Sequence, residues 1–468
     1  MADFRAILQN LPEVTPPVEK KLSFNVKLKW TLIVLIAFFF MANISLYGLG
    51  QNSLDRFKYL AILMGTDFGS IISLGIGPIV MASIILQLLV GSKILDIDVS
   101  DPEGKKFFQG LQKLLVFFFI LFEAMIYVLM GGLQAKVGVL FGIPLVYVLI
   151  FQLILGGLVI LFLDEICHKW GFGSGVSLFI AAGVGWRLIA EAFQFIDVQG
   201  NFNPTGKVLQ LFTSLIANPP DTSTFMLALA AIIATVILFL VVVWAQSLKI
   251  EIPLSYDRLR GYSMKWPLQF FYASNIPVIL TAALVANLQL FGVLLQNNMG
   301  HPTLIGNFRD GQAVCDASGC GVLYWVSSSN VVQAILTHSW NWNLIGQTMG
   351  HIIFFMALSA MFSIFWVKTS GMDSSNQAEN ILKSGLQIPG FRKDKRILES
   401  ILSRYVMPLT VMGGMAVGLL ASVADVLGAM VGGTALLLGI MITYQFYQSI
   451  AQQHAMDMNP AMKKLMGV

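Results

Sequence analysis

The chain has 468 residues, of which 56% are hydrophobic and only 12% are charged, and its mean hydropathy is +0.75. About a quarter of the residues of a soluble domain are usually charged, so this composition excludes an ordinary soluble protein and indicates a membrane protein. The formal net charge of +4 is too small to argue by itself for a nucleic-acid partner.

Ten stretches of the chain are apolar over the roughly 20 residues that a helix needs to cross a bilayer. They lie at about 30–49, 71–93, 112–133, 139–163, 173–196, 224–247, 268–294, 347–369, 404–424 and 429–450. The first follows a mostly polar segment and has no small-residue cleavage site, so we expect a retained span rather than a signal peptide. Of the 29 lysines and arginines, 23 fall on the side of the N-terminus and 6 on the other, which predicts that both termini are cytoplasmic.

Residues 60–91 form an apolar run that is too long for one span, too short for two, and interrupted by GTDFGS. Asp67 in this interruption would be costly against lipid, and non-helical backbone is tolerated at membrane depth only within protein or water. We therefore expect a short re-entrant helix at about 55–64 that dips in from the outside, followed by a span that starts near Ser70. The residues alone leave open whether this helix plugs a cavity or lies on the membrane surface.

Five of the expected spans precede a long polar stretch at 197–223 and five follow it. Pro78 and Pro277 lie near the starts of the second and seventh spans, which run in opposite directions, and this favours an inverted repeat. Proline is common near any helix start, so the pair alone does not decide the matter. The expected division is an N-terminal half at 1–196, an external connection at 197–223, a C-terminal half at 224–450 and a cytoplasmic tail at 451–468.

The side chains with reactive chemistry form no recognisable catalytic or metal site. Cys315 and Cys320 share the polar loop DGQAVCDASGCG, where they either form a disulfide or remain thiols. The GFGSG at 171–175 follows no strand, so it is read as a turn and not as a phosphate-binding loop. His338 and His351 flank a span without the spacing of a metal site or a nucleophile. We expect no catalytic residue, no metal and no cofactor.

Several stretches, in order along nearly the whole chain, resemble the SecY family of protein-conducting channels. They are GIGPIVMASIILQLLVGSKI followed by FQGLQKLLVF, GFGSGVSLFIAAG, EIPLSYDRLRG with FFYASNIPVILTAAL, IPGFRK, and LGAMVGGTALLLGIMITYQFY. Each motif is weak alone, whereas the ordered set is specific, and LGIGPIV is closer to archaeal than to bacterial members. The resemblance implies an all-α polytopic membrane protein, with ten transmembrane helices in two inverted five-helix halves around a central pore and a re-entrant plug helix.

The implied function is that of the pore-forming subunit of a protein translocation channel in the cell membrane. Such a channel conducts secreted polypeptides and releases signal sequences and transmembrane segments sideways into lipid. Its constriction is an aliphatic ring, carried over here by position to Ile76, Val80, Val176, Ile180, Ile279 and Leu438. An apolar neck sheds water and hinders ions. The implied plug, at about 55–70, includes Leu54, Asp55, Phe57, Leu60, Ile62, Leu63, Met64 and Asp67.

The resemblance also implies a lateral gate, at which Met81, Glu123 and Asn287 form a polar latch. Relatives can carry a hydroxyl at the position of Met81. An ionisable group in mid-span, such as Glu123 in LFEAMIYVLM, is costly unless it is paired or hydrated. From the residues alone, a structural hydrogen bond inside the bundle explains Glu123 as well as a latch does.

Basic loops at 249–266 and 369–403 predict partner contacts. The positive-inside bias and contact with anionic lipid explain many such residues, but a loop as long as the second is usually functional or disordered. The resemblance implies that both loops dock the ribosome, where arginine forks suit the phosphates of ribosomal RNA. The residues expected there are Arg258, Arg260, Arg392, Lys393, Lys395 and Arg396. The other implied partners are SecE, a small beta subunit, signal sequences, nascent polypeptides and membrane lipid.

A secondary transporter of a small solute is the alternative function. Ten spans, an inverted repeat and a broken helix near Asp67 all suit such a protein. A transporter needs polar or charged groups that face each other at mid-membrane, and apart from Glu123 and Asp67 the span centres are nearly free of charge. An intramembrane enzyme is disfavoured because the chain shows no catalytic constellation.

Overall fold

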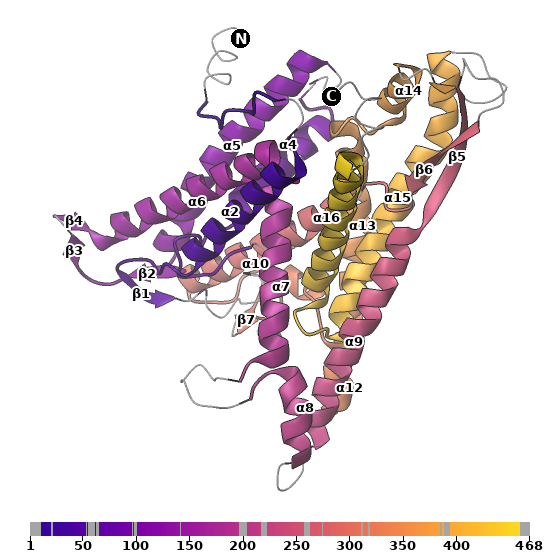
Figure 1. The fold of residues 1–468 in the computed structure, drawn as a ribbon. Coiled ribbons are helices and arrows are strands. Elements are labelled where there is room, and N and C mark those ends of the chain that lie inside the picture. Colours follow the sequence, from indigo (N-terminus) through magenta and orange to yellow (C-terminus); the bar gives the residue numbers. More distant parts are fainter. Residues whose placement is uncertain are drawn as a thin grey trace.

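In the computed structural model, long helices run between two ends that carry short strands and short helices (Figure 1). The structure describes residues 11–19, 22–52, 54, 61, 65–95, 97, 101–140, 142–195, 204–216, 222–256, 263–273, 275–309, 312–316, 319–383, 386–387 and 394–458. The long helices are α2 (Phe24–Ala42), α4 (Gly77–Gly91), α5 (Pro102–Leu129), α6 (Leu145–Trp170), α7 (Gly175–Phe193), α9 (Thr222–Ser247), α10 (Ile276–Met299), α13 (Trp342–Thr369), α15 (Lys395–Leu427) and α16 (Gly433–Met458).

Four shorter helices and eleven strands connect the long helices within the described residues. The short helices are α8 (Lys207–Ile216), α11 (Val322–Val326), α12 (Val331–Leu336) and α14 (Ser374–Lys383). The strands are β1 (Leu49–Asn52), β2 (Leu133–Ala135), β3 (Val139–Leu140), β4 (Ile143–Pro144), β5 (Lys249–Tyr256), β6 (Ser263–Gln269), β7 (Phe308–Arg309), β8 (Gln312–Ala313), β9 (Cys315–Asp316), β10 (Gly319–Cys320) and β11 (Leu386–Gln387). They pair as β1–β2, β3–β4, β7–β8, β9–β10 and the three-stranded sheet β11–β5–β6, and every pairing is antiparallel.

Each of the ten apolar stretches of the sequence corresponds to one long helix, which confirms the predicted all-α architecture. Among the described residues, eight helices are long and apolar enough to cross a membrane. The other two are α4, which has only 15 residues, and α16, whose C-terminal half is polar. A 15-residue helix is about 22 Å long and does not cover a hydrocarbon core of roughly 30 Å by itself. The turns before α4 make up part of the remaining depth.

The expected start of the seventh span, at 268, is wrong. Residues 263–269 form β6, in which Leu268 pairs with Ile250 of β5, and α10 begins only at Ile276. Leu268 is 3% exposed, in a small core separate from the main one. An apolar strand that packs into such a core has the same hydropathy as the start of a membrane span, so composition could not separate the two.

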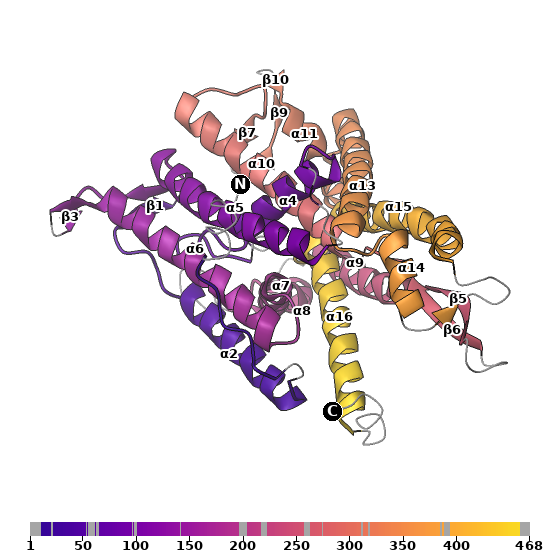
Figure 2. The ribbon, with the colours of Figure 1, turned by 90° about the horizontal axis from the view of Figure 1, so that it is seen from above.

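Glycines set the spacing of the long helices where these pack most closely. A Cβ on Gly414 of α15 would lie 2.7 Å from the Cβ of Ser363 on α13, and a Cβ on Gly439 of α16 would lie 2.6 Å from Cγ1 of Val184 on α7. Small residues let helix backbones approach each other in lipid, where no hydrophobic effect drives the helices together. Figure 2 shows the result from above: α2, α5 and α6 gather on one side, α13 and α15 on the other, and α7 lies between them.

The N-terminal segment 11–19 crosses the end of α6. The indole Nε1 of Trp170 donates to the carbonyl oxygen of Thr15 at 3.1 Å, and Lys169 forms an ion pair with Glu13. That hydrogen-bonded ammonium lowers the pKa of Glu13. The segment 11–19 and the C-terminal end of α16 lie at the same end of the bundle as α14 and the β5–β6 hairpin (Figure 1).

Candidate functional site

The six aliphatic residues expected to form a constriction lie at four helices, α4, α7, α10 and α16. Five of them are buried in one continuous cluster, and Val176 packs against that cluster. Ile76 immediately precedes α4, and its carbonyl oxygen accepts from the amide of Val80 at 3.0 Å, so these two residues share one helical turn. Five of the six side chains are thus buried inside the protein, and Val176 is half-buried.

Ile180 lies where α7 meets two other segments. One turn after it, Val184 packs directly on Gly439, the residue next to Leu438. A Cβ placed on Gly65 would lie 3.5 Å from the Cβ of Phe179 and 3.8 Å from the amide nitrogen of Ile180. Gly65, in the expected plug segment, therefore rests on α7 beside Ile180, a residue of the expected ring.

Most of the expected plug is not described by the structure. Asp55, Phe57, Leu60, Ile62, Leu63 and Met64 lie outside the described residues. Leu54 is buried, whereas Asp67 is exposed. A Cβ on Gly132, just after α5, would lie 3.3 Å from Cδ2 of Leu54 and 2.9 Å from Cδ2 of Leu294 on α10. Leu54 therefore lies close to the point where the chain just after α5 meets α10.

The second span begins later than expected. Residues 65–76 form a series of turns, and α4 starts at Gly77 rather than near Ser70. Hydroxyl groups stabilise these turns, because Ser70 Oγ donates to the carbonyl oxygen of Asp67 at 2.7 Å and Ser73 Oγ accepts from the amide of Gly69 at 2.9 Å. Serine side chains that bond to nearby backbone offer the chain an alternative to the helix, and apolar content alone does not reveal this.

Asn52 closes the base of the loop that holds the expected plug. Its Nδ2 donates to the carbonyl oxygen of Phe68 at 2.9 Å, and its Oδ1 accepts from the amide of Leu54 at 3.1 Å. Gly69 has a φ of +103°, and a Cβ there would lie 2.9 Å from Asn52 Nδ2. Only glycine combines this backbone conformation with so close an approach.

The three residues expected at the lateral gate do not bond directly to one another. Glu123 on α5 is fully buried, and neither of its carboxyl oxygens has a hydrogen-bond partner among the described residues. Asn287 on α10 is 1% exposed, and its Nδ2 donates within its own helix to Ala283 at 2.9 Å. Met81 is half-buried against the main core. Unpaired polar groups at such depth carry a large desolvation cost.

Another buried polar atom, the hydroxyl oxygen of Tyr127, lies on the same helix as Glu123. Tyr127, one turn after Glu123, is fully buried with no hydrogen-bond partner for its hydroxyl in the described part of the chain. Its ring meets that of Phe68 edge-on, with the centroids 6.5 Å apart. Glu123 therefore lies one helical turn before Tyr127, which contacts Phe68 in the expected plug segment.

The two basic loops meet in one sheet. Strand β11, from the second loop, pairs with β5 of the first through the registers Leu386↔Tyr256 and Gln387↔Ser255. Beside this sheet, the hydroxyl of Tyr272 donates to the carbonyl oxygen of Met372 at 2.6 Å, and burial raises the pKa of this tyrosine to about 12. The structure thus joins segments of both loops in one unit.

The basic side chains expected on this unit are only partly described. Arg258, Arg260, Arg392 and Lys393 lie outside the described residues. Lys395 Nζ donates to Glu379 Oε2 of α14 at 3.0 Å, so its charge is already paired. The backbone amide of Arg396 donates to Asp394, which caps α15.

At the opposite end, Cys315 and Cys320 are joined by a disulfide across the β9–β10 hairpin, where they are direct neighbours in register. Cys167 is a buried free thiol. No group of three or more histidine, cysteine or acidic side chains that could hold a metal occurs in the residues searched, which are the described ones.

Residues 70–447 match the family model of SecY. The chain belongs to the SecY family. It is 43% identical over 470 residues to the protein translocase subunit SecY of Methanothermobacter thermautotrophicus, and the match covers 99% of this chain and 98% of the relative. A solved structure of a protein-conducting channel superimposes with a TM-score of 0.81 at 38% identity, covering 98% of this chain and 99% of the other. Sec61 in a canine ribosome–channel complex from the endoplasmic reticulum superimposes with a TM-score of 0.78 at 37% identity, with coverage of 98% and 99%.

One polar cluster of this SecY-family chain was missed by sequence reasoning. His351 on α13 is buried, with Nδ1 2.7 Å from the carbonyl oxygen of Val326 and Nε2 3.5 Å from Oδ2 of Asp425. Oδ1 of Asp425 accepts from the amide of Thr434, at 2.7 Å, and the Thr434 hydroxyl donates to Oδ2. The sequence offers no signal for this cluster, because its members come from four separate segments.

Proposed function

We propose that this chain is the central pore-forming subunit of a protein translocation channel, a passive conduit for secreted polypeptides that also releases signal sequences and membrane anchors into lipid. The observation that carries the proposal is the burial of five of the six expected ring residues, from four helices, in one apolar core against which Val176 packs. Its relatives named as protein translocase subunits and its likeness to a protein-conducting channel support the same conclusion.

The aliphatic ring acts as the seal of the conduit. Water confined between apolar walls loses hydrogen bonds, so a narrow aliphatic neck dewets and ions meet a desolvation barrier. The side chains of Ile76, Ile180 and Leu438 present no hydrogen-bonding group, so they favour no particular peptide sequence. They yield to a passing chain by changing rotamers. The segment at about 55–70 closes the outer side when the channel is idle, and its exit rests on α7 beside Ile180.

The lateral gate opens between α4 and α5 on one side and α10 and α13 on the other. The resting seam is tight, because a Cβ on Gly91 of α4 would lie 2.4 Å from Cδ1 of Phe365 on α13. Glu123 and Asn287 each keep a buried oxygen without a hydrogen-bond partner among the described residues. Opening of the seam admits water or polar peptide groups to these oxygens, which offsets part of the cost of separating the helices.

The remaining proposals concern the setting of the channel. The residues 1–196 and 224–450 are two halves joined by the external connection 197–223, in a cell membrane with both termini cytoplasmic. SecE and a small beta subunit cover part of the exposed apolar surface, and the sheet β11–β5–β6 with its basic loops docks the ribosome. The likeness to Sec61 in a ribosome–channel complex supports this last contact. The chain carries no catalysis of its own, and energy comes from outside it.

Crosslinking of an arrested nascent chain tests the conduit. We expect single cysteines at Ile76, Val80 or Ile279, in a variant without native cysteines, to crosslink to a secretory chain stalled on the ribosome. Phe239 on α9, which is 51% exposed, is the control position and should stay unlabelled. Equal labelling at Phe239 and at the ring, or labelling only at Phe239, would refute the central conduit. Ion-coupled uptake of a small solute without crosslinks would favour the transporter instead.

A further inference from the structure

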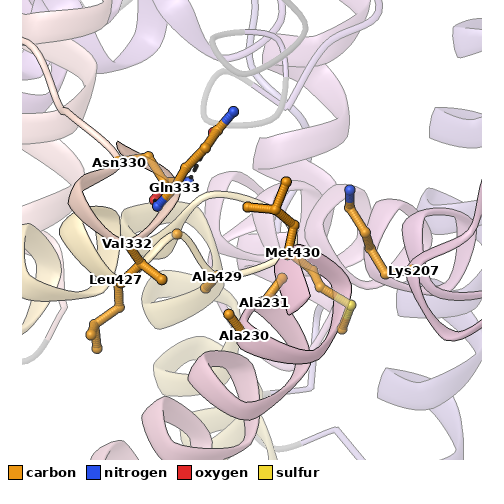
Figure 3. Close-up of a pocket in the computed structure, with 11 residues that line it drawn as sticks. Lys207, Ala230, Ala231, Asn330, Val332, Gln333, Leu427, Ala429 and Met430 are labelled. Atoms are coloured by element: carbon orange, nitrogen blue, oxygen red, sulfur yellow. Dashed lines mark hydrogen bonds between the residues drawn. The ribbon is translucent and has the colours of Figure 1, made fainter. Parts of the chain in front are cut away.

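A cavity of about 190 Å³ lies at the end of the bundle that carries α8 and α12, away from the ring and the gate. Its walls come from the start of α8, from α9, from α12 and from the turn between α15 and α16. Figure 3 shows Met430 of this turn lying between Lys207 on one side and the amides of Asn330 and Gln333 on the other. Ala230 and Ala231 of α9 form the apolar wall beneath them.

Contacts between distant parts of the sequence hold the walls of this cavity in place. Asn330 caps α12, because its Oδ1 accepts from the amide of Gln333 at 3.0 Å. A Cβ on Gly428, whose φ is +67°, would lie 2.4 Å from Asn330 Nδ2, so α12 sits directly on the turn. The amide of Met430 donates to Thr235 Oγ1 of α9 at 3.1 Å. Three of the four walls, α9, α12 and the turn between α15 and α16, are therefore held together by direct contacts.

Lys207 supplies the only charge on the described lining of the cavity. Its Nζ lies 3.5 Å from Oε1 of Gln210. Glu191 on α7 interacts electrostatically with both Arg187 and Lys207. Neither Arg187 nor Glu191 lines the cavity, so Lys207 alone sets the charge of the described lining. A cation above an apolar wall is complementary to an amphiphile with an anionic head.

The depth of the cavity fits a membrane lipid. Helix α8 exposes Phe212, Leu215 and Ile216, an apolar face typical of a helix that lies in the membrane interface. Helix α9 has 26 residues, about 39 Å, so it extends past a hydrocarbon core of roughly 30 Å at both ends. Ala230 is about 12 Å from the start of α9 at 1.5 Å per residue, which places it in the outer part of the hydrocarbon core. Lys207 lies at the start of α8, the helix with the exposed apolar face.

We propose that this cavity binds an anionic phospholipid of the leaflet on which α8 lies. The phosphate lies against Lys207, and the glycerol and first methylenes lie on Ala230, Ala231 and Met430. A free phosphate offers the same charge without the apolar part. Only a lipid contacts both the Lys207 cation and the apolar wall of the cavity. This site does not depend on the proposed conduit, and it ties α8 and α9 to the turn that starts α16.

A photoreactive phosphatidylglycerol tests the proposal on the full chain in phosphatidylcholine nanodiscs. We expect labelling of peptides around Ala230 and Met430, and Lys207→Gln should reduce it by about fivefold, since one lysine near a lipid surface contributes a modest electrostatic attraction. Ala230→Phe, which fills the apolar wall, should reduce it as well. Lys136→Gln removes an exposed lysine from another loop and should leave the labelling unchanged.

Two further arms separate the lipid from its rivals. An excess of inorganic phosphate should not compete with the labelled lipid, and loss of labelling in its presence would overturn the lipid in favour of a free anion. Crosslinks from position 207 to a partner subunit in the assembled complex, in place of lipid, would overturn it too, as would equal labelling of the parent, Lys207→Gln and Lys136→Gln proteins. Should Ala230→Phe fail to fold, Lys207→Gln decides alone, because its side chain is half-exposed.

Discussion

Asp425 stabilises the start of helix α16 from the end of the preceding helix, α15. The first amides of a helix lack partners within it, and Asp425 satisfies the amide of Thr434. Nδ1 of His351 faces the carbonyl oxygen of Val326, which can only accept a hydrogen bond, so Nδ1 must carry a proton. Thr434 is one turn before Leu438, so this cluster positions a residue of the proposed ring from outside that ring.

We expect Asp425→Ala to destabilise the protein by about 3 kcal/mol, because it leaves buried partners of a carboxylate without a counterpart. Thermal unfolding in detergent measures the loss, and ion conductance in planar bilayers should rise as Leu438 shifts. Asp425→Asn is the matched control, since its retained carbonyl oxygen still accepts from Thr434. If Asp425→Ala unfolds and conducts like the parent protein, the cluster does not position α16.

The loop that carries the expected plug has a base held from both sides. The amide of Leu46 donates to the carbonyl oxygen of Gly69 at 2.9 Å, and the amide of Ile71 donates to that of Ile44 at 2.9 Å. Asn52 adds the cross-link to Phe68. Backbone hydrogen bonds thus fix where the loop leaves and rejoins the bundle. The side chain of Asn52 completes this closure, and a single substitution removes it.

Asn52→Ala should raise the resting ion conductance of the reconstituted channel severalfold while leaving protein translocation possible. The reason is that it removes both the donor to Phe68 and the acceptor for Leu54, at about 1 kcal/mol for each bond. Asn52→Asp keeps the acceptor and should have a smaller effect. Single-channel recording provides the measurement, and a resting conductance identical in all three proteins would count against the plug assignment.

The molecule has two separate apolar cores, one among the long helices and one under the sheet β11–β5–β6. One continuous apolar core contains residues of all ten long helices or of the turns that lead into them. The small core under the sheet is distinct and holds α14 and the start of α15 beneath β5 and β6. Both basic loops emerge from this second unit, so a partner that binds there reads one rigid surface built from two distant parts of the chain.

Charge reversal of the two loops should weaken ribosome binding in a salt-dependent way. Log affinity falls as log salt rises, and Arg258→Glu combined with Arg392→Glu should make this fall shallower. The magnitude of the slope should drop by about 2, roughly one for each phosphate that the protein no longer neutralises. Co-sedimentation at several salt concentrations measures it. Lys136→Glu, on the side predicted to be external, is the control and should bind as the parent does. A double variant with an unchanged slope would mean that the ribosome docks elsewhere.

The sequence by itself determined the number of long helices and where their apolar lengths lie. Lipid as solvent forces apolar length on every span, and this can be read locally, as can the basic flanks that predict the direction of the chain. Only the tertiary structure decided that five of the six aliphatic residues are buried in one core with Val176 packed against it, that 263–269 is a strand, that 65–76 are turns, and that His351 meets Asp425. These features depend on partners far away in the sequence, such as β5 for β6, and hydropathy carries no information about which distant segment a residue will meet.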